Sequence, residues 1–259
     1  PAEVAAGRRA TPEVADGQAL LAAARDAGVE FRGGSTVWGI FDERLLAVAH
    51  PDGRTQEVRA DALILATGAY ERPVPFPGWT LPGVMAAGGV KALLRSQGLV
   101  PGRRILLAGT GPLLLATAAA LVEAGVEVLA VVEANRVRGV WRHLRALWGE
   151  MDLLRQAAAA VRALRRAGVP ILRGHLVQEA LGDSRVGEVR LAEVDKDWRV
   201  VPGAEHRFRP DVLAVHFGFV PHTDLARLAG CRCTYRPVVG GWVPEHDARM
   251  ATSVPGVFV

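Results

Sequence analysis

The residues whose types and spacing point most clearly to chemistry lie between positions 105 and 114. They include the run Gly109-Thr110-Gly111-Pro112-Leu113-Leu114. An apolar stretch comes before this run, and a helix-forming segment comes after it. This placement between a strand and a helix is typical of a dinucleotide-binding fingerprint, in which Gly109 permits the tight turn and Gly111 lets the backbone approach a pyrophosphate. The positive end of the helix dipole favours that anion. Leu114 stands where such fingerprints carry a third glycine, so we expect the helix to lie further from the strand.

An acidic residue extends this pattern. Glu133 ends the next apolar strand, 24 residues after Gly109, and a carboxylate there can accept hydrogen bonds from ribose hydroxyls and repels a 2′-phosphate. We therefore expect NAD rather than NADP, although Arg136 and Arg138 follow closely and could still reach a phosphate. The alternative is a Rossmann-like unit that binds nothing, with Glu133 merely solvated at a strand end.

Other candidate residues give weaker signals. The turn Ala66-Thr67-Gly68 ends a short apolar run, and its small side chains would let the backbone lie against a planar or phosphorylated ligand. An ordinary strand-to-loop turn would look the same. His216 and His222 are interpreted as structural residues rather than bases. The C-x-C spacing of Cys231 and Cys233 favours one packed and one exposed thiol over a metal or redox pair.

Several chemistries lack their motifs. There is no C-x-x-C, so no dithiol is expected to accept electrons from a flavin. There is no G-x-S-x-G, which leaves a serine hydrolase unsupported. No catalytic residue and no metal ligand can be named from the sequence.

Length and composition set the class of protein. The 259 residues carry 31 Lys and Arg against 27 Asp and Glu, and half of them are hydrophobic, which excludes a disordered chain and allows one or two domains with a sizeable core. The basic residues are interspersed with acids, so we expect no nucleic-acid partner. Residues 105–122 carry no charge, but the glycines within them favour strand, turn and buried helix over a membrane span. No secretion signal is visible, and we expect a cytoplasmic protein.

The elements that must position these residues follow from periodicity, glycine and proline. We expect a helix from Pro12 to Gly28, capped by Thr11, and a buried strand at 62–66. A proline-rich crossing between domains follows at 71–78, and then a helix at 84–97. A first group of short strands is expected at 29–31, 36–41, 45–50 and 56–60. A βαβ unit with a parallel sheet is expected from 104–108, 112–124 and 126–132. Further elements are expected at 151–167, 169–172, 177–179, 188–194, 198–201, 211–215 and 256–259.

Several of these stretches together resemble one group of flavoproteins. The run from Leu63 to Trp79, LILATGAYERPVPFPGW, is the most specific, and the resemblance continues through 108–114, 168–174, 218–221, 240–244 and 252–258. The chain is similar to the two-dinucleotide-binding-domain flavoproteins that include the pyridine nucleotide–disulphide reductases. Within them it looks most like the flavin subunits of multi-component amine and opine dehydrogenases, a group that includes subunits of opine oxidase, hydrogen cyanide synthase, dye-linked proline dehydrogenase and sarcosine oxidase.

The resemblance implies a Rossmann-like α/β fold of two dinucleotide-binding domains, with an FAD domain incomplete at both ends. Residues 1–78 would be a partial FAD-binding domain with a small β-meander, residues 79–222 an inserted NAD(P)-binding-type domain, and residues 223–259 a return into the FAD domain. The family carries a G-x-G-x-x-G before, and an Ala-Gly-Asp after, the segments matched here, so we expect this chain to be an interior segment of a longer protein.

The resemblance also implies site residues. Ala66, Thr67 and Gly68 would approach FAD, and Val37 would contact its adenine through the backbone. The residues implied at the NAD-type site are Gly109, Thr110, Gly111, Pro112, Leu113 and Glu133.

Three functions remain open at this point. The first is an FAD-dependent oxidoreductase subunit that passes hydride or electrons between flavin and a nicotinamide or a partner redox centre. A partner dehydrogenase subunit would then handle a small amine or amino acid. The second is an NAD-binding module without turnover of its own, and the third is a docking domain that has lost its nucleotide.

Overall fold

The computed structural model describes residues 2–3, 12–136 and 151–259. The chain forms two compact units, which are described separately. Unit 1 consists of residues 1–6 and 71–218, and unit 2 of residues 7–70 and 219–259. The chain therefore passes from one unit to the other between Tyr70 and Glu71 and returns between Gly218 and Phe219.

A five-stranded parallel sheet forms the centre of unit 1. Its strand order is β11-β10-β9-β15-β7. The strands are β7 (Val84–Ala86), β9 (Arg104–Gly109), β10 (Glu127–Glu133), β11 (Ile171–Arg173) and β15 (Val212–His216). Crossover connections between parallel neighbours carry the helices, so the carboxyl ends of all five strands meet at one edge.

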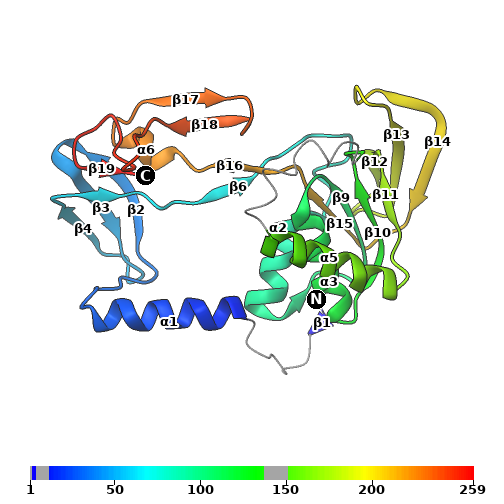
Figure 1. Cartoon of the computed structure of the whole chain (residues 1–259), viewed down its shortest axis with the longest axis horizontal. Helices are drawn as coiled ribbons and strands as arrows, with labels where there is room; N and C mark the ends of the chain where they lie inside the picture. The colour runs from blue at the N-terminus through cyan, green and yellow to red at the C-terminus, as the bar shows by residue number, and fades with distance from the viewer. Residues whose placement is uncertain (1, 4–11, 137–150) are drawn as a thin grey trace. The chain divides into compact units, whose positions relative to one another are not determined.

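The sheet of unit 1 is buried on both faces. Ile105 and Leu107 point into a core that is shared with the helices. Leu106 and Ala108, which alternate with them, point into a second core on the other face. The helices are α2 (Ala87–Ala92), the π-helical turn η2 (Leu93–Gln97), α3 (Pro112–Glu123) and α5 (Met151–Arg166). An antiparallel meander covers the second face and consists of β12 (His175–Leu181), β13 (Glu188–Val194) and β14 (Val200–Phe208) (Figure 1). Burial on both faces explains why the central strands read as continuous apolar runs.

The predicted helix at 84–97 begins later than expected. Val84–Ala86 forms β7 and pairs with Leu213–Val215, because an apolar triplet beside a buried strand gains ladder hydrogen bonds that a helix would forgo. The end of the segment agrees with the prediction, since Gly98 adopts a left-handed conformation with φ of 68°. The short pair of β1 (Ala2–Glu3) and β8 (Leu99–Val100) follows it.

The proline-rich segment is anchored on the meander of unit 1. Ala180 donates its backbone N–H to the Pro77 carbonyl at 2.8 Å, and Val186 does the same to Pro82 at 2.8 Å. Gly78 has φ of +83°, and a Cβ there would overlap the Ala180 carbonyl. Residues 72–83 form turns and irregular backbone, as so many prolines require.

Most elements of unit 2 are short. The elements are α1 (Pro12–Asp26), β2 (Thr36–Phe41), the 3-10 turn η1 (Asp42–Arg44), β3 (Leu45–Ala49), β4 (Thr55–Arg59), β5 (Leu63–Ile64), β6 (Ala69–Glu71, whose last residue belongs to unit 1), β16 (Phe219–Pro221), α6 (Asp224–Leu228), β17 (Cys233–Arg236), β18 (Gly241–Pro244) and β19 (Val257–Phe258). β2, β3 and β4 form the expected meander, while β16 pairs with β6, β17 with β18, and β19 with β5. The core of this unit consists of Ile40, Leu65, Ala226, Cys231 and Val257.

Two sequence predictions in unit 2 are wrong. Residues 29–31 form no strand, since Val29 and Phe31 are exposed rather than packed. The predicted strand at 62–66 shrinks to Leu63–Ile64 and is buried on one face only, because Leu65 joins the core while Ile64 is 75% exposed. The elements from 219 to 244 were not predicted, because short pieces give too few residues for a period to be read.

Candidate functional site

The glycine turn, residues Gly109–Gly111, lies at the carboxyl edge of the parallel sheet. Gly109 ends β9 with φ of +138°, and a Cβ at this position would overlap the backbone carbonyl of His216 on β15. Thr110 donates its backbone N–H to that same carbonyl at 2.7 Å. Only glycine fits at the first position of the turn, because the neighbouring strand fills the space that a side chain would need.

The second glycine leaves an open approach to the backbone. Gly111 is the N-cap of α3, with φ of +98°, and a Cβ there would meet no atom within 4 Å. Pro112 occupies the first helical position, where its missing N–H is not required. A ligand can therefore reach the Gly111 backbone and the N-terminus of a twelve-residue helix, the place where anions are favoured.

Leu113 and Leu114 complete the predicted run. Leu113 is half-buried. Leu114 is fully buried in the core shared with Ile105 and Leu107. The leucine that stands in place of the third glycine therefore fills the core between the sheet and the helices.

Glu133 lies beside the glycine turn. It ends β10 in register with Gly109, and its Oε2 accepts the Gly111 N–H at 3.0 Å. Its Oε1 accepts the Asn135 N–H at 3.1 Å. A carboxylate has about four lone-pair positions, so further hydrogen-bond donors can still be accommodated.

Burial raises the pKa of Glu133 above its ordinary value. The hydrogen bonds from Asn135 and Gly111, and the electrostatic influence of Arg173 and His216, act in the opposite direction but do not cancel the burial effect. Arg173 ends β11 in register with Glu133. The site therefore holds one partly desolvated carboxylate at the end of a helix whose dipole favours its charge.

Arg136 and Arg138 were the two arginines expected within reach of a phosphate, and the structure describes only the first of them. Arg136 lies at the same edge, and its guanidinium is bound to β13, where Nε donates to the Val194 carbonyl at 3.1 Å and Nη2 pairs with Glu193. Arg138 lies outside the described residues. A cavity of about 460 Å³ adjoins Arg136 and is lined by Ala134, Asn135, Asp195, Lys196, Trp198 and Val201.

A buried acid–imidazole pair, the Glu71–His216 pair, lies at this edge and was not predicted. Nδ1 of His216 lies 2.6 Å from Glu71 Oε2, and the other oxygen of Glu71 accepts the Gly88 N–H at 2.6 Å. Glu71 thus supplies the cap that Ala86 cannot give to α2. His216 was interpreted as a structural residue, and nothing in the sequence links it to a carboxylate 145 positions away.

The other predicted residues lie in unit 2. Thr67 Oγ1 donates to the His222 carbonyl at 2.7 Å, and the His222 N–H donates to the Gly68 carbonyl at 3.0 Å. Gly68 has φ of +69° with open space where a Cβ would lie, and Ala66 is exposed. Val37 packs against the core that contains Leu65. The turn is therefore rigidly held, while its small residues present bare backbone.

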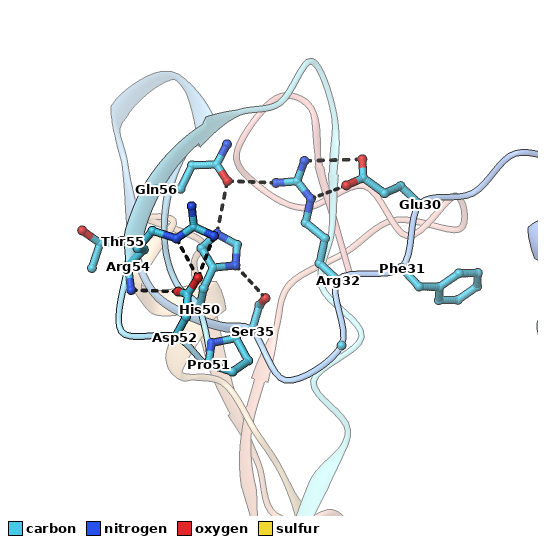
Figure 2. Close-up of a pocket in the computed structure, with 11 residues that line it drawn as sticks. Glu30, Phe31, Arg32, Ser35, His50, Pro51, Asp52, Arg54, Thr55 and Gln56 are labelled. Carbon is cyan, nitrogen blue, oxygen red and sulfur yellow. Dashed lines mark hydrogen bonds and ion pairs between the residues drawn. The ribbon is translucent and has the colours of Figure 1, made fainter.

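A second cavity, which lies in unit 2, was not predicted. It has a volume of about 740 Å³ and lies around the start of β2 and the end of β3. Figure 2 shows its polar side chains bonded to one another: His50 contacts Ser35 and Gln56, at 3.1 and 3.2 Å. Arg32 pairs with Glu30 at 2.8 Å and thereby lowers the pKa of that carboxyl. Both arginines that line this cavity are paired, Arg32 with Glu30 and Arg54 with Asp52, so neither is free to bind an anion.

The two cysteines are not joined in a disulfide. Cys231 and Cys233 are both free, and burial raises the pKa of the Cys233 thiol. Among the described residues no group of three or more potential ligands could hold a metal ion. Within that part of the chain, no helix has both the length and the apolarity needed to cross a bilayer.

Comparison with known proteins gives one family. The sequence profile described as pyridine nucleotide-disulphide oxidoreductase matches residues 1–259. The HcnB component of hydrogen cyanide synthase from Pseudomonas aeruginosa is 38% identical over 202 residues, which cover 78% of this chain and 43% of the relative. An opine oxidase component from Rhizobium meliloti is 34% identical over 242 residues, which cover 91% of this chain and 50% of the relative. The chain thus spans about half the length of these curated relatives.

Solved structures agree on the fold. The crystal structure of T. acidophilum thioredoxin reductase matches with a TM-score of 0.61 and 18% identity, over 95% of this chain and 70% of that structure. At this identity the match supports the two-dinucleotide-binding-domain architecture.

The Glu71–His216 pair generates a first prediction. Replacing Glu71 by Ala removes the acceptor of both His216 and the Gly88 N–H, and we expect the free energy of unfolding to fall by about 3 kcal/mol. Glu71→Gln keeps one carbonyl acceptor and should cost about half as much. Urea unfolding followed by circular dichroism measures both. Glu123→Ala removes the same charge from the exposed end of α3 and should change stability by less than about 0.5 kcal/mol. Equal stability of the Glu71→Ala and Glu123→Ala proteins would contradict the assigned role.

The raised pKa of Glu133 gives a second prediction. The unfolded carboxyl ionises near its ordinary value of 4.5, and the folded one at a higher pH, so the folded state binds the proton more tightly. The stability of wild type relative to Glu133→Gln is therefore greatest at low pH and decreases as pH rises from 4.5 through the folded pKa. Urea unfolding of both proteins from about pH 4 to about pH 8 checks the sign. A difference that grows with pH would show that hydrogen bonding outweighs burial.

Proposed function

Since the chain belongs to the pyridine nucleotide-disulphide oxidoreductase family, we propose that it supplies the nicotinamide-nucleotide site, and part of the FAD site, of a flavin-dependent oxidoreductase. Unit 1 is the nicotinamide-nucleotide-binding domain in this proposal. Unit 2 is part of the FAD-binding domain. The observation that carries the proposal is the glycine turn with Glu133 beside it.

The glycine turn suits a dinucleotide on physical grounds. The backbone at Gly111 is uncovered, so a pyrophosphate can approach the helix N-terminus without displacing a side chain. Glu133 keeps free lone pairs for the hydroxyls of the adenosine ribose. Thr110, Pro112 and Leu113 form the rest of the turn and the first turn of α3, and we assign them to the same site.

NAD is the nucleotide that this site fits better. The Glu133 carboxylate would lie close to a 2′-phosphate and repel it, whereas it can accept a hydrogen bond from a free 2′-hydroxyl. NADP is the less favoured nucleotide in this proposal, since the remaining cations must then outweigh that repulsion.

The FAD site would draw four residues from unit 2. Gly68 offers open space at positive φ and Ala66 is exposed, so a flat ligand can lie against the backbone there. Thr67 fixes this turn through its hydrogen bond to His222, and Val37 would meet the adenine through its backbone. When bound, the flavin and nicotinamide supply the hydride and electron transfer. The described residues hold and orient them, and we assign no catalytic acid or base.

The whole protein, in our proposal, is one component of a multi-subunit amine or amino acid dehydrogenase. Support comes from the relatives, which are named as subunits of hydrogen cyanide synthase and of opine oxidase. A partner dehydrogenase subunit would act on the small-molecule substrate and exchange electrons with this one. We place the enzyme in the cytoplasm.

Nucleotide titration of glycine variants tests the nicotinamide site. In Gly111→Ala the new methyl group would occupy the space through which the pyrophosphate approaches, so we expect NADH affinity to fall by about tenfold or more. Gly125→Ala is the matched control, because Gly125 also has positive φ and open space but lies at the other end of α3. Gly125→Ala should lose about 1 kcal/mol of stability and Gly111→Ala about 1–3 kcal/mol, because Gly111 (φ 98°, ψ 172°) lies in a region that essentially only glycine adopts. Thermal unfolding checks that both variants are folded, and the Gly125 variant should bind NADH like wild type.

Two outcomes of that titration would contradict the proposal. The first is wild-type protein that binds neither NADH nor NADPH, and the second is equal NADH affinity in the two glycine variants. Glu133→Ala should weaken NADH and narrow its advantage over NADPH. An unchanged ratio would remove Glu133 from the site.

Flavin content tests the second site. Purified protein that contains this chain should bind FAD and show the absorption of an oxidised flavin. Thr67→Val removes the hydroxyl that holds the turn and should lower the flavin-to-protein ratio severalfold. Thr55→Val, on an exposed position of β4, makes the same change outside the turn and should leave the ratio unchanged. Wild-type protein that stays colourless after addition of FAD would overturn this part of the proposal.

A further inference from the structure

Glu193 is not one of the residues assigned to the nucleotide site, yet its ion pair orients the guanidinium of the neighbouring Arg136. We infer that Glu193 is a specificity-determining residue, which discriminates against NADP by holding Arg136 away from the position of a 2′-phosphate. The inference rests on the proposed nucleotide site and adds to it a second element of selection, beside the Glu133 carboxylate.

Backbone hydrogen bonds connect Arg136 and Glu193 to the site. Gly174 donates its N–H to the Glu133 carbonyl at 2.8 Å, and Val194 donates its N–H to the Gly174 carbonyl at 2.8 Å. Glu133, which would meet the ribose, is therefore joined through two hydrogen bonds to the strand end that carries Glu193. Arg136 comes three residues after Glu133 in the chain, so its side chain starts close to the ribose position.

The Arg136 side chain is held at three points. Its Nε donates to the Val194 carbonyl at 3.1 Å, and its Nη2 pairs with Glu193. Its stem lies across Gly174, where an added Cβ would come within 2.5 Å of Nε. The Arg136 and Glu193 side chains are only about one-third exposed, at 35% and 31%, so water screens this ion pair less than an exposed one.

Charge explains how this arrangement selects a nucleotide. A 2′-phosphate next to Glu133 needs a cation, and an arginine that follows this strand is well suited because it can bind phosphate through two donors. Here both the charge and the direction of Arg136 are committed to Glu193 and Val194. Lys196, which also lines the adjoining cavity, is 89% exposed and strongly hydrated, so it compensates only weakly.

The substitution Glu193→Gln tests the inference. It preserves the size of the side chain but removes the charge that orients Arg136, so the guanidinium becomes available to the 2′-phosphate. In calorimetric titration of the full chain we expect NADPH affinity to rise about five- to tenfold, while NADH affinity changes less than about twofold. The double variant Arg136→Gln/Glu193→Gln should lose the whole gain.

Controls separate this effect from a change in net charge. Glu205→Gln removes one negative charge from β14, the adjacent strand, where Glu205 pairs with Arg207. It should leave both affinities unchanged. Thermal unfolding checks that all variants are folded, and a loss of NADH binding in Glu193→Gln with an unchanged melting temperature would count against the inference.

The possible results distinguish this inference from the proposal beneath it. NADH binding like wild type, with no gain for NADPH in Glu193→Gln, would overturn the inference alone. A gain that persists without Arg136 would also overturn it, since the cation would then be another residue. Wild-type protein that binds neither nucleotide would overturn the proposed function together with the inference.

Discussion

The contact between the backbones of Gly109 and His216 is the constraint on which the candidate site depends. The two residues end neighbouring parallel strands in register, and the His216 carbonyl fills the space where a side chain at position 109 would lie. The same carbonyl accepts the Thr110 N–H, so one acceptor both excludes a side chain and directs the turn. Gly111 comes two residues after Gly109, and a Cβ there would meet no atom within 4 Å.

The polar groups around this edge are organised so that buried groups have partners. Glu71 bonds the His216 ring and caps α2, while Glu133 bonds the amide of Gly111, the residue just before α3, and the loop after β10. Glu71 satisfies an N-terminal amide of α2, which has no side-chain cap at Ala86, and Glu133 fixes the residue at which α3 begins. Residues distant in the sequence thus hold the strand ends and helix starts together, which is the rigidity that a dinucleotide site requires.

Sequence reasoning located the parts of the fold that depend on local pattern. The strand–turn–helix at 104–124 and the neighbouring strand to Glu133 follow from apolar periodicity and two glycines, and the structure has them within a few residues. The family itself followed from the run at 63–79. The resemblance could not indicate which side of β5 is covered, and Ile64 proved exposed. Local pattern could not indicate that Val84–Ala86 joins the sheet, because only the partner strand β15 makes that triplet a strand.

Side-chain partners that are distant in the sequence could not be predicted from local pattern either. Arg136 was read as a cation near a phosphate, which its position after Glu133 justifies, but its ion pair with a residue 57 positions later is visible only in three dimensions. The Glu71–His216 pair is the same kind of feature. Spacing along a chain predicts which residues share a turn or a strand, whereas the charge that neutralises a buried group depends on which strands become neighbours.

The carbonyl that fixes the glycine turn also bears on the order in which the chain folds. Thr110 leaves the ribosome about one hundred residues before His216, so during synthesis the turn exists for some time without its acceptor. β9 and β10 can pair early, since they are close in sequence, but β15 must close a long loop before it can join them. The turn therefore reaches its final shape only when the last strand of the sheet is inserted. A nascent chain that ends before residue 216 already contains both glycines of the turn, but the turn does not yet have its final conformation.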